Sequence, residues 1–398
     1  MVGYDMSWYF DQAIKSNAIL LDGANLDNKS FPLFTVFKNE LISLANGEGL
    51  ELGYTYPGGQ NNLRELIAKQ ESNLEETPIK MEDIVVNSGG CSGTFDNLFR
   101  ILSKYHNSGR NKVVVPIPSY PEIFKSLDYN KLSTTYLPTL RKNGFQPTAE
   151  ELMDHMDSQT VAIFLTNPGN PSCTYIDNAQ MEKITQIAKR YGCYLIVDAI
   201  FEESPGANKG QKTFHSCKYY DKLIKIKGFS KDRPQLNDLR LGWSVSKNEE
   251  LNKHLMNSAE VSDYSNSTIL ERIAIKDMIN RTSNTNVNYN NELFNYQKNI
   301  KAGLIKGVSL LKNHYCIQDV IEPKAGNIIF ARVKDNQLIS DSHNLFLYFL
   351  NKCNTLVSPG NIFKAPQDEL WFRITMSQSP QNFEKNIKKI LKSLEDIQ

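Results

Sequence analysis

Lys231 and Asp198 are the residues whose types and positions most directly suggest chemistry. Lys231 follows the strand-like run 223–226, and Asp198 ends the apolar run 194–197. Burial lowers the pKa of a lysine amine, which makes the neutral nucleophile available for imine formation. A carboxylate at the end of an apolar strand could pair with a protonated ring nitrogen of a ligand. The ordinary alternatives are a solvated surface lysine and a helix cap.

Two turns add further candidate groups. The segment 88–94 reads Ser-Gly-Gly-Cys-Ser-Gly-Thr and precedes a helix-like run, so its backbone N–H groups and the helix dipole could hold a phosphate. No Gly-Lys-Ser/Thr follows, which excludes a Walker loop and leaves a flexible turn as the alternative. The segment 167–172, Asn-Pro-Gly-Asn-Pro-Ser, is a rigid double turn that would hold its asparagine side chains in place. An ordinary surface turn is the alternative there.

The elements that must position these groups alternate between short β-branched runs and amphipathic stretches. The strand-like runs are 84–86, 113–115, 161–165, 194–197 and 223–226. This alternation predicts an α/β fold with a mostly parallel sheet covered by helices on both faces. Ligands bind at the carboxyl ends of such strands. Five strand ends carry polar or glycine-rich residues, which predicts one shared site: 89–90, 118–120, 167–171, 198 and 230–231.

The pattern changes after a long helical stretch at about 287–313, which could connect two domains. Beyond it, the runs 328–330 and 371–374 alternate with helical patterns at 345–351 and up to residue 394. A chain of 398 residues usually needs more than one hydrophobic core. We therefore expect a large domain at 46–285 and a smaller α+β domain at 286–398. The N-terminal segment 1–45 is expected to pack with the smaller domain.

Composition narrows the class of protein. The formal net charge of +1 and the absence of polybasic runs argue against partners such as nucleic acid or a membrane surface. No run approaches the roughly 20 apolar residues that span a bilayer, and no secretory signal is recognisable. The six cysteines are scattered without zinc spacing, and no histidine pair has metal-ligand spacing. We therefore expect a cytoplasmic enzyme without disulfides or a bound metal.

Taken together and in this order, four motifs resemble the fold-type-I pyridoxal-phosphate aminotransferases of class I/II. They are Tyr-Thr-Tyr-Pro-Gly-Gly at 54–59 with Leu-Arg-Glu-Leu at 63–66, the 167–172 turn, Gly-Phe-Ser-Lys at 228–231 with Arg-Leu-Gly-Trp at 240–243, and Trp-Phe-Arg-Ile at 371–374. The resemblance covers roughly residue 20 to the C-terminus. It implies pyridoxal 5'-phosphate as cofactor and transfer of an amino group between an L-amino acid and a 2-oxo acid.

The resemblance also implies a role for each matching position. Lys231 would hold the cofactor as a Schiff base and move the proton at the substrate Cα, while Asp198 would pair with the ring nitrogen. Arg373 would bind the substrate α-carboxylate, and Gly23 lies where the N-terminal segment closes over the substrate. Tyr54 would reach the site of a neighbouring subunit, which implies a homodimer. The remaining cofactor-binding positions are Gly89, Gly90, Cys91, Tyr120, Asn170, Ser230 and Arg240. Asn170 would also contribute to the substrate site.

Several positions depart from the family's pattern. Phe201 stands where the family has a tyrosine that donates to the ring's 3′ oxygen, and Gly228 replaces a serine that contacts the phosphate. The 167–172 turn ends in Ser-Cys instead of Thr-Gly, and the segment 232–239 is one residue longer than usual. The loss of the tyrosine should raise the pKa of the cofactor's imine.

The departures leave a second reading open: a lyase, a cyclase or an amino-acid oxidase or hydroxylase of a specialised biosynthetic pathway on the same scaffold. A third reading is a non-catalytic sensor domain, since a fold by itself does not determine function. Retention of Lys231 and the lack of a DNA-binding module before the domain argue against it.

Overall fold

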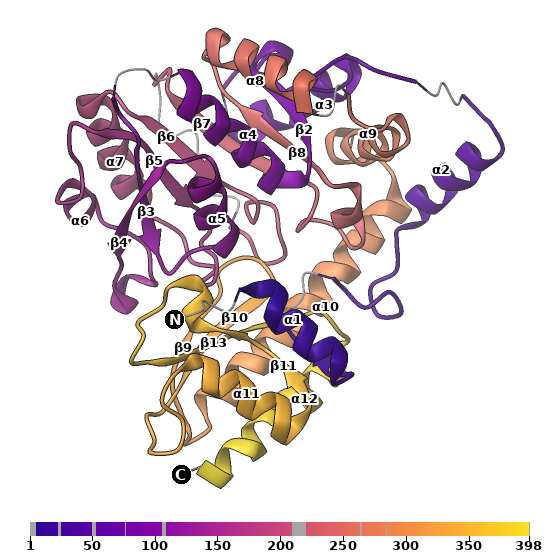
Figure 1. The fold of residues 1–398 in the computed structure, drawn as a ribbon. Coiled ribbons are helices and arrows are strands. Elements are labelled where there is room, and N and C mark those ends of the chain that lie inside the picture. The colour runs from indigo at the N-terminus through magenta and orange to yellow at the C-terminus, as the bar shows by residue number, and fades with distance from the viewer. Residues whose placement is uncertain are drawn as a thin grey trace.

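The computed structural model describes residues 5–22, 25–49, 53–75, 77–105, 109–208, 220–262, 265–283 and 285–397. A seven-stranded sheet and a four-stranded sheet form two regions, and the long helix α10 (Val287–Lys312) runs between them (Figure 1). No helix among the described residues is long and apolar enough to cross a bilayer.

The large sheet has the strand order β2-β8-β7-β6-β5-β3-β4. Only the contacts of β8 are antiparallel, so the prediction of a mostly parallel sheet is confirmed. The strands are β2 (Ile84–Ser88), β3 (Lys112–Ile117), β4 (Ser133–Pro138), β5 (Thr160–Thr166), β6 (Tyr194–Asp198), β7 (Leu223–Gly228) and β8 (Leu241–Val245).

Helices cover both faces of this sheet because most strand residues are apolar on both sides (Figure 1). Val85 packs with Phe95 of α4 on one face, whereas the next residue, Val86, packs in the cluster that contains Ile67 of α3 on the other. The helices of the first face are α4 (Gly90–Tyr105), α5 (Pro121–Tyr129) and α8 (Glu249–Ser262). Those of the second face are α3 (Asn61–Glu75), α6 (Ala149–Met153), α7 (Asn178–Tyr191) and α9 (Thr268–Ser283).

The small sheet is antiparallel, with the order β12-β13-β10-β9. Its strands are β9 (Ile317–Ile321), β10 (Ile328–Val333), β12 (Ser358–Pro359) and β13 (Leu370–Thr375), with the helices α11 (Ser342–Cys353) and α12 (Pro380–Leu394) nearby. This region contains the predicted runs at 328–330 and 371–374.

The N-terminal segment contacts both regions. Strand β1 (Ile19–Leu20) pairs with β11 (Thr355–Leu356), and α1 (Met6–Lys15) packs beside them. In contrast, α2 (Thr35–Ala45) packs against α9 and α10. The expected domain limits at residues 45 and 285 stay a prediction.

Candidate active site

A cavity of about 350 Å³ lies at the carboxyl ends of the parallel strands, next to β13 of the small sheet. It collects most of the residues that the sequence singled out: Cys91, Tyr120, Asn170, Asp198, Ser230, Lys231, Arg240 and Arg373. Gly89 and Gly90 come immediately before Cys91 in the chain. Tyr54 lies elsewhere, on an outer groove, and Gly23 falls outside the described residues. The predicted shared site at the strand ends is therefore present as one cavity.

Lys231 enters the cavity three residues after β7 ends. Burial, and then the positive charge of Arg373, lower the pKa of Lys231 to about 8. Its Nζ lies 6.0 Å from the centroid of the Phe201 ring. A sizeable fraction of this amine is therefore neutral and nucleophilic near pH 8, as covalent catalysis by a lysine requires.

Asp198 is the last residue of β6 and is buried. Its Oδ1 accepts a hydrogen bond from the Ile200 amide at 3.2 Å, and its carbonyl oxygen accepts one from the Asn167 amide at 2.9 Å. Burial raises the pKa of Asp198 to about 7, although the Ile200 hydrogen bond and the charge of Lys231 oppose the rise. A cationic partner in the cavity would favour the ionised carboxylate.

This pKa gives a prediction for the protein without bound ligands. The folded state holds the Asp198 proton up to about pH 7, whereas an unfolded aspartate releases it near its ordinary pKa of 3.8. Stability should therefore fall as the pH rises between these values. Asp198→Asn removes this titration, so its stability relative to wild type should increase from pH 4 to pH 7, by at most about 4 kcal/mol. Urea unfolding at several pH values measures the difference; parallel curves would contradict the expectation.

The glycine turn before α4 forms a cradle for an anion. Gly89 has a φ of +81° and Gly90 one of +69°, a region that side-chain-bearing residues rarely adopt. At Gly93, a Cβ would lie 2.0 Å from the Ser88 carbonyl oxygen. The first-turn amides of α4 point out of the helix without partners inside it, and Arg240 Nη2 donates to the Gly89 carbonyl oxygen at 2.6 Å. Arginine and helix N–H groups together suit a phosphate.

One detail of the expected phosphate site is corrected. The Gly90 amide donates to the Arg240 carbonyl oxygen at 2.8 Å, so its hydrogen is already used and cannot serve a phosphate. The two backbone segments can approach this closely because residue 242 is a glycine. A Cβ on Gly242 would lie 2.5 Å from the Gly90 carbonyl carbon. The amides that follow, of Cys91 and Ser92, are the ones available in the first turn.

Gly228 and Cys91 compensate each other sterically. A Cβ at position 228 would lie 3.3 Å from Cys91 Sγ and 3.0 Å from the Leu241 carbonyl oxygen. The thiol therefore occupies space next to a residue without a side chain. The serine that the resemblance implies at position 228 would be crowded here, so Gly228 leaves the space that the Cys91 thiol occupies.

Arg373 is held in a fixed orientation on β13 and is buried. Its Nη1 donates to Asn170 Oδ1 at 3.0 Å, and its Nη2 donates to the Asp22 carbonyl oxygen at 3.0 Å and to Ser358 Oγ at 3.1 Å. Its Nε is buried without a hydrogen-bond partner. An oriented guanidinium with unused donor capacity is suited to a carboxylate. Asn170 keeps its amide nitrogen for donation to a ligand oxygen.

Phe201 fills the position where a tyrosine was expected from the resemblance. Its ring is buried against Cys173, and a Cβ at Gly326 would lie 2.9 Å from its Cδ1. Phe201 also lines the cavity, so the ring presents carbon, not a hydroxyl, to whatever binds there.

Among the cavity residues that the sequence did not single out are two polar side chains, Glu122 and Thr166. Thr166 Oγ1 is buried without a hydrogen-bond partner. Glu122 lies two residues after the 118–120 strand end, in the first turn of α5, and this position was the signal that could have identified it. Thr166 ends β5 in the same way that Asp198 ends β6.

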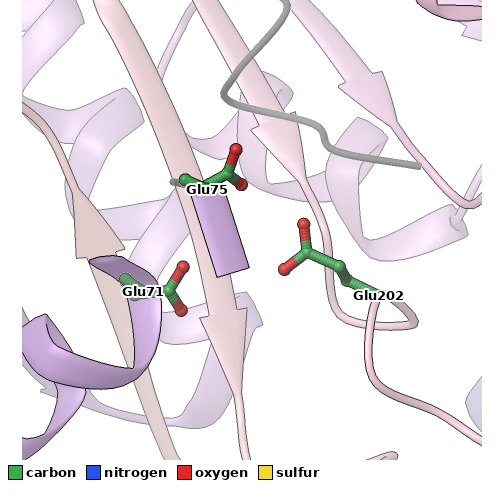
Figure 2. Close-up of side chains that lie close together, drawn as sticks. All are labelled: Glu71, Glu75 and Glu202. Carbon is green, nitrogen blue, oxygen red and sulfur yellow. The ribbon is translucent and has the colours of Figure 1, made fainter. Parts of the chain in front are cut away.

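A second charged cluster lies under the sheet, apart from the cavity. Carboxylate oxygens of Glu71, Glu75 and Glu202 come within 4.8 Å of one another (Figure 2). Such spacing could suit a metal ion, but Lys225 Nζ lies 3.0, 2.5 and 2.7 Å from these three carboxylates. Its ammonium group occupies the place of a cation. Lys227, two residues along β7, pairs with Glu203 at 2.6 Å.

The fold and the cavity define a pyridoxal-phosphate enzyme of fold type I. The groups in the cavity fit this cofactor. An amine with a lowered pKa suits its aldehyde, a buried carboxylate suits its ring nitrogen, and backbone N–H groups with an arginine suit its phosphate. The unpartnered Thr166 hydroxyl offers a further polar contact in the same cavity.

The pattern of the family "aminotransferase class I and II" matches residues 19–390, so the chain belongs to this family. It is a pyridoxal-phosphate-dependent transaminase. An aspartate aminotransferase of Pyrococcus horikoshii is 22% identical, covering 86% of this chain and 83% of the relative. A probable aspartate/prephenate aminotransferase of Aquifex aeolicus is 24% identical over 86% and 84%. The crystal structure of a Thermotoga maritima aspartate aminotransferase superposes with a TM-score of 0.82 at 20% identity over 99% and 97%.

Proposed function

We propose that Lys231, Asp198 and Arg373 are the residues that carry amino-group transfer in this protein. One observation supports this most strongly: the three groups line a single cavity at the strand ends, where the pKa of Lys231 is lowered to about 8 and that of Asp198 is raised to about 7. Groups whose pKa values are shifted towards neutrality suit proton transfer under physiological conditions.

When bound, pyridoxal phosphate supplies an aldehyde that condenses with amines and a ring that accepts the electrons of a deprotonated carbon. Lys231 would bind that aldehyde and then remove and return the proton at the substrate Cα. Asp198 would hold a proton at the ring nitrogen, which keeps the ring electron-poor. Arg373 would bind the substrate α-carboxylate and so orient the Cα–H bond towards Lys231.

The other lining residues would hold the cofactor. The amides of Cys91 and Ser92, with Ser230 and Arg240, would bind the phosphate. Tyr120 would lie against the ring, and Asn170 would donate to a ring oxygen and help to place the substrate. Gly23 stays a prediction as a residue that closes over the substrate.

A spectroscopic half-reaction tests this proposal. Pure protein loaded with pyridoxal phosphate should convert to the amino form of the cofactor when a substrate amino acid is added, and a 2-oxo acid should reverse the change. The lyase, cyclase and oxidase alternatives are not favoured, because the relatives are aminotransferases. Release of ammonia or peroxide without a reversible spectral change would support those alternatives instead.

The Phe201 departure gives a separate prediction. In Phe201→Tyr, the new hydroxyl should donate to the charged form of the cofactor and lower the pKa that governs the near-visible absorbance, by about one to two pH units. A pH titration of the loaded protein measures this midpoint. Phe201→Leu is the control, because it changes the ring without adding a donor and should leave the midpoint close to that of wild type. An unshifted midpoint in the tyrosine variant would refute the argument.

A homodimer is part of the same proposal. Tyr54 is 85% exposed and lines an outer groove with Arg272 and Lys276, away from its own chain's cavity. A hydroxyl in this groove could donate a hydrogen bond to the cofactor phosphate bound by a second copy of the chain. Light scattering should give twice the mass of one chain, and Tyr54→Phe should weaken cofactor affinity without changing that mass. A monomer with full affinity would exclude the arrangement.

A cytoplasmic location also stays a prediction, based on the scattered cysteines.

A further inference from the structure

Two carboxylates in the cavity have oxygens that lack any hydrogen-bond partner. They are Asp22 Oδ1 and Glu122 Oε2, and both atoms are inaccessible to solvent. Asp22 as a whole is only 3% exposed. Both residues line the cavity that contains Lys231 and Arg373. Because a buried carboxylate oxygen without a donor is unfavourable, the pair calls for a ligand that donates hydrogen bonds or carries positive charge.

The position of the two carboxylates relates them to the substrate. The Asp22 carbonyl oxygen accepts from Arg373 Nη2 at 3.0 Å, and both carboxylates act electrostatically on Arg373. Burial, and then the charge of Glu122 and a hydrogen bond to its side chain, raise the pKa of the Tyr120 hydroxyl, which places Glu122 beside that hydroxyl. An amino acid whose α-carboxylate lies on Arg373 would therefore extend its side chain close to this pair.

The charge balance of the cavity argues against an acidic side chain. Among the described lining residues, the cations are Lys231, Arg240 and Arg373. Each already has a proposed partner: the cofactor aldehyde, the phosphate and the α-carboxylate. A second substrate carboxylate would meet Asp22 and Glu122, and like charges at short range repel.

We infer that the substrate is an amino acid with a cationic side chain, a guanidinium or an ammonium group at the end of an alkyl stem, held by Asp22 and Glu122. Met6 and Phe10 of α1 also line the cavity, and they offer apolar surface for the stem. This inference rests on the proposed function, because it takes Arg373 as the α-carboxylate site. It differs from aspartate, after which the similar aminotransferases are named.

The test compares amino acids of matched size in the half-reaction of the loaded protein. L-Lysine, L-ornithine and L-arginine are compared with L-norleucine, which has a similar stem without charge, and with L-aspartate. The second-order rate constant for the cationic amino acids should exceed that for norleucine and aspartate by at least about 10-fold. A second readout is calorimetric binding of L-arginine to protein in which borohydride has fixed the cofactor.

Two variants assign the preference to the pair. Glu122→Gln and Asp22→Asn should each reduce the arginine-to-norleucine ratio by about 10- to 100-fold, mainly through KM, because one charged hydrogen bond is lost. Glu65→Gln and Asp368→Asn remove the same charges from exposed positions outside the cavity and should leave the ratio unchanged.

The outcomes separate this inference from the proposed function. If aspartate or norleucine reacts as fast as the cationic amino acids, or if the variants keep the wild-type ratio, the substrate inference is overturned while amino-group transfer stands. If no amino acid produces the spectral change, the proposed function itself fails. A cationic preference that both variants weaken supports the inference.

Discussion

Replacing Lys231 with alanine is expected to abolish amino-group transfer, with a loss in kcat of at least about 10⁴-fold. The amine at position 231 has two proposed tasks, binding the cofactor aldehyde and moving the substrate Cα proton, and alanine can perform neither. Its place in the cavity and its pKa of about 8 make it the nucleophile best suited to both. The measurement is the single-turnover spectral change, together with borohydride fixation of the cofactor followed by peptide mapping.

Controls distinguish loss of the amine from loss of the fold. Lys69→Ala removes an exposed lysine of α3 and should keep full activity and full fixation. A small exogenous amine such as methylamine should restore part of the proton transfer in Lys231→Ala, since it can enter the space left by the side chain. Cofactor fixed to a different lysine, or undiminished activity in Lys231→Ala, would disprove the assignment.

Replacing Lys225 with methionine is expected to lower the free energy of unfolding by about 3 to 5 kcal/mol, because it removes one of the cations that neutralise a group of buried carboxylates. Lys225 is fully buried, and its Nζ contacts Glu71, Glu75 and Glu202 at 3.0 Å or less. Burial would lower the pKa of Lys225, but the three carboxylates outweigh it and raise that pKa well above its ordinary value. The side chain is therefore charged in the folded protein. Urea unfolding followed by circular dichroism measures the change.

Lys69→Met provides the matched control, since it removes the same charge from an exposed position and should change stability by less than about 0.5 kcal/mol. A second variant tests the cause. Adding Glu75→Gln to Lys225→Met removes one of the negative charges that Lys225 neutralises and should recover part of the lost stability. If Lys225→Met is as stable as wild type, the ion pairs of Lys225 do not contribute to the free energy of unfolding.

The apolar pattern of the sequence predicted five of the seven strands of the large sheet, together with the order of chemical groups along them. Alternating apolar runs and amphipathic stretches define parallel strands, and parallel strands place their carboxyl ends on one edge. Asp198 and Lys231 each stand where such a strand stops or shortly after it, so their meeting in one cavity follows from local pattern alone. The four motifs added the class of cofactor, because they resemble those of the family to which the chain belongs.

The surroundings of those groups could be seen only in the folded chain, because contacts between distant segments leave no local pattern. Lys225 and Lys227 alternate along β7 as residues of a solvated face would, yet both are buried by carboxylates, one of them 150 positions away. Asp22 comes next to Arg373 across 351 positions, through the pairing of β1 with β11. Cys91 occupies space next to Gly228 in the same way. Charge and shape at the site arise from packing between segments, whereas the period of apolar residues reports only the element in which each residue lies.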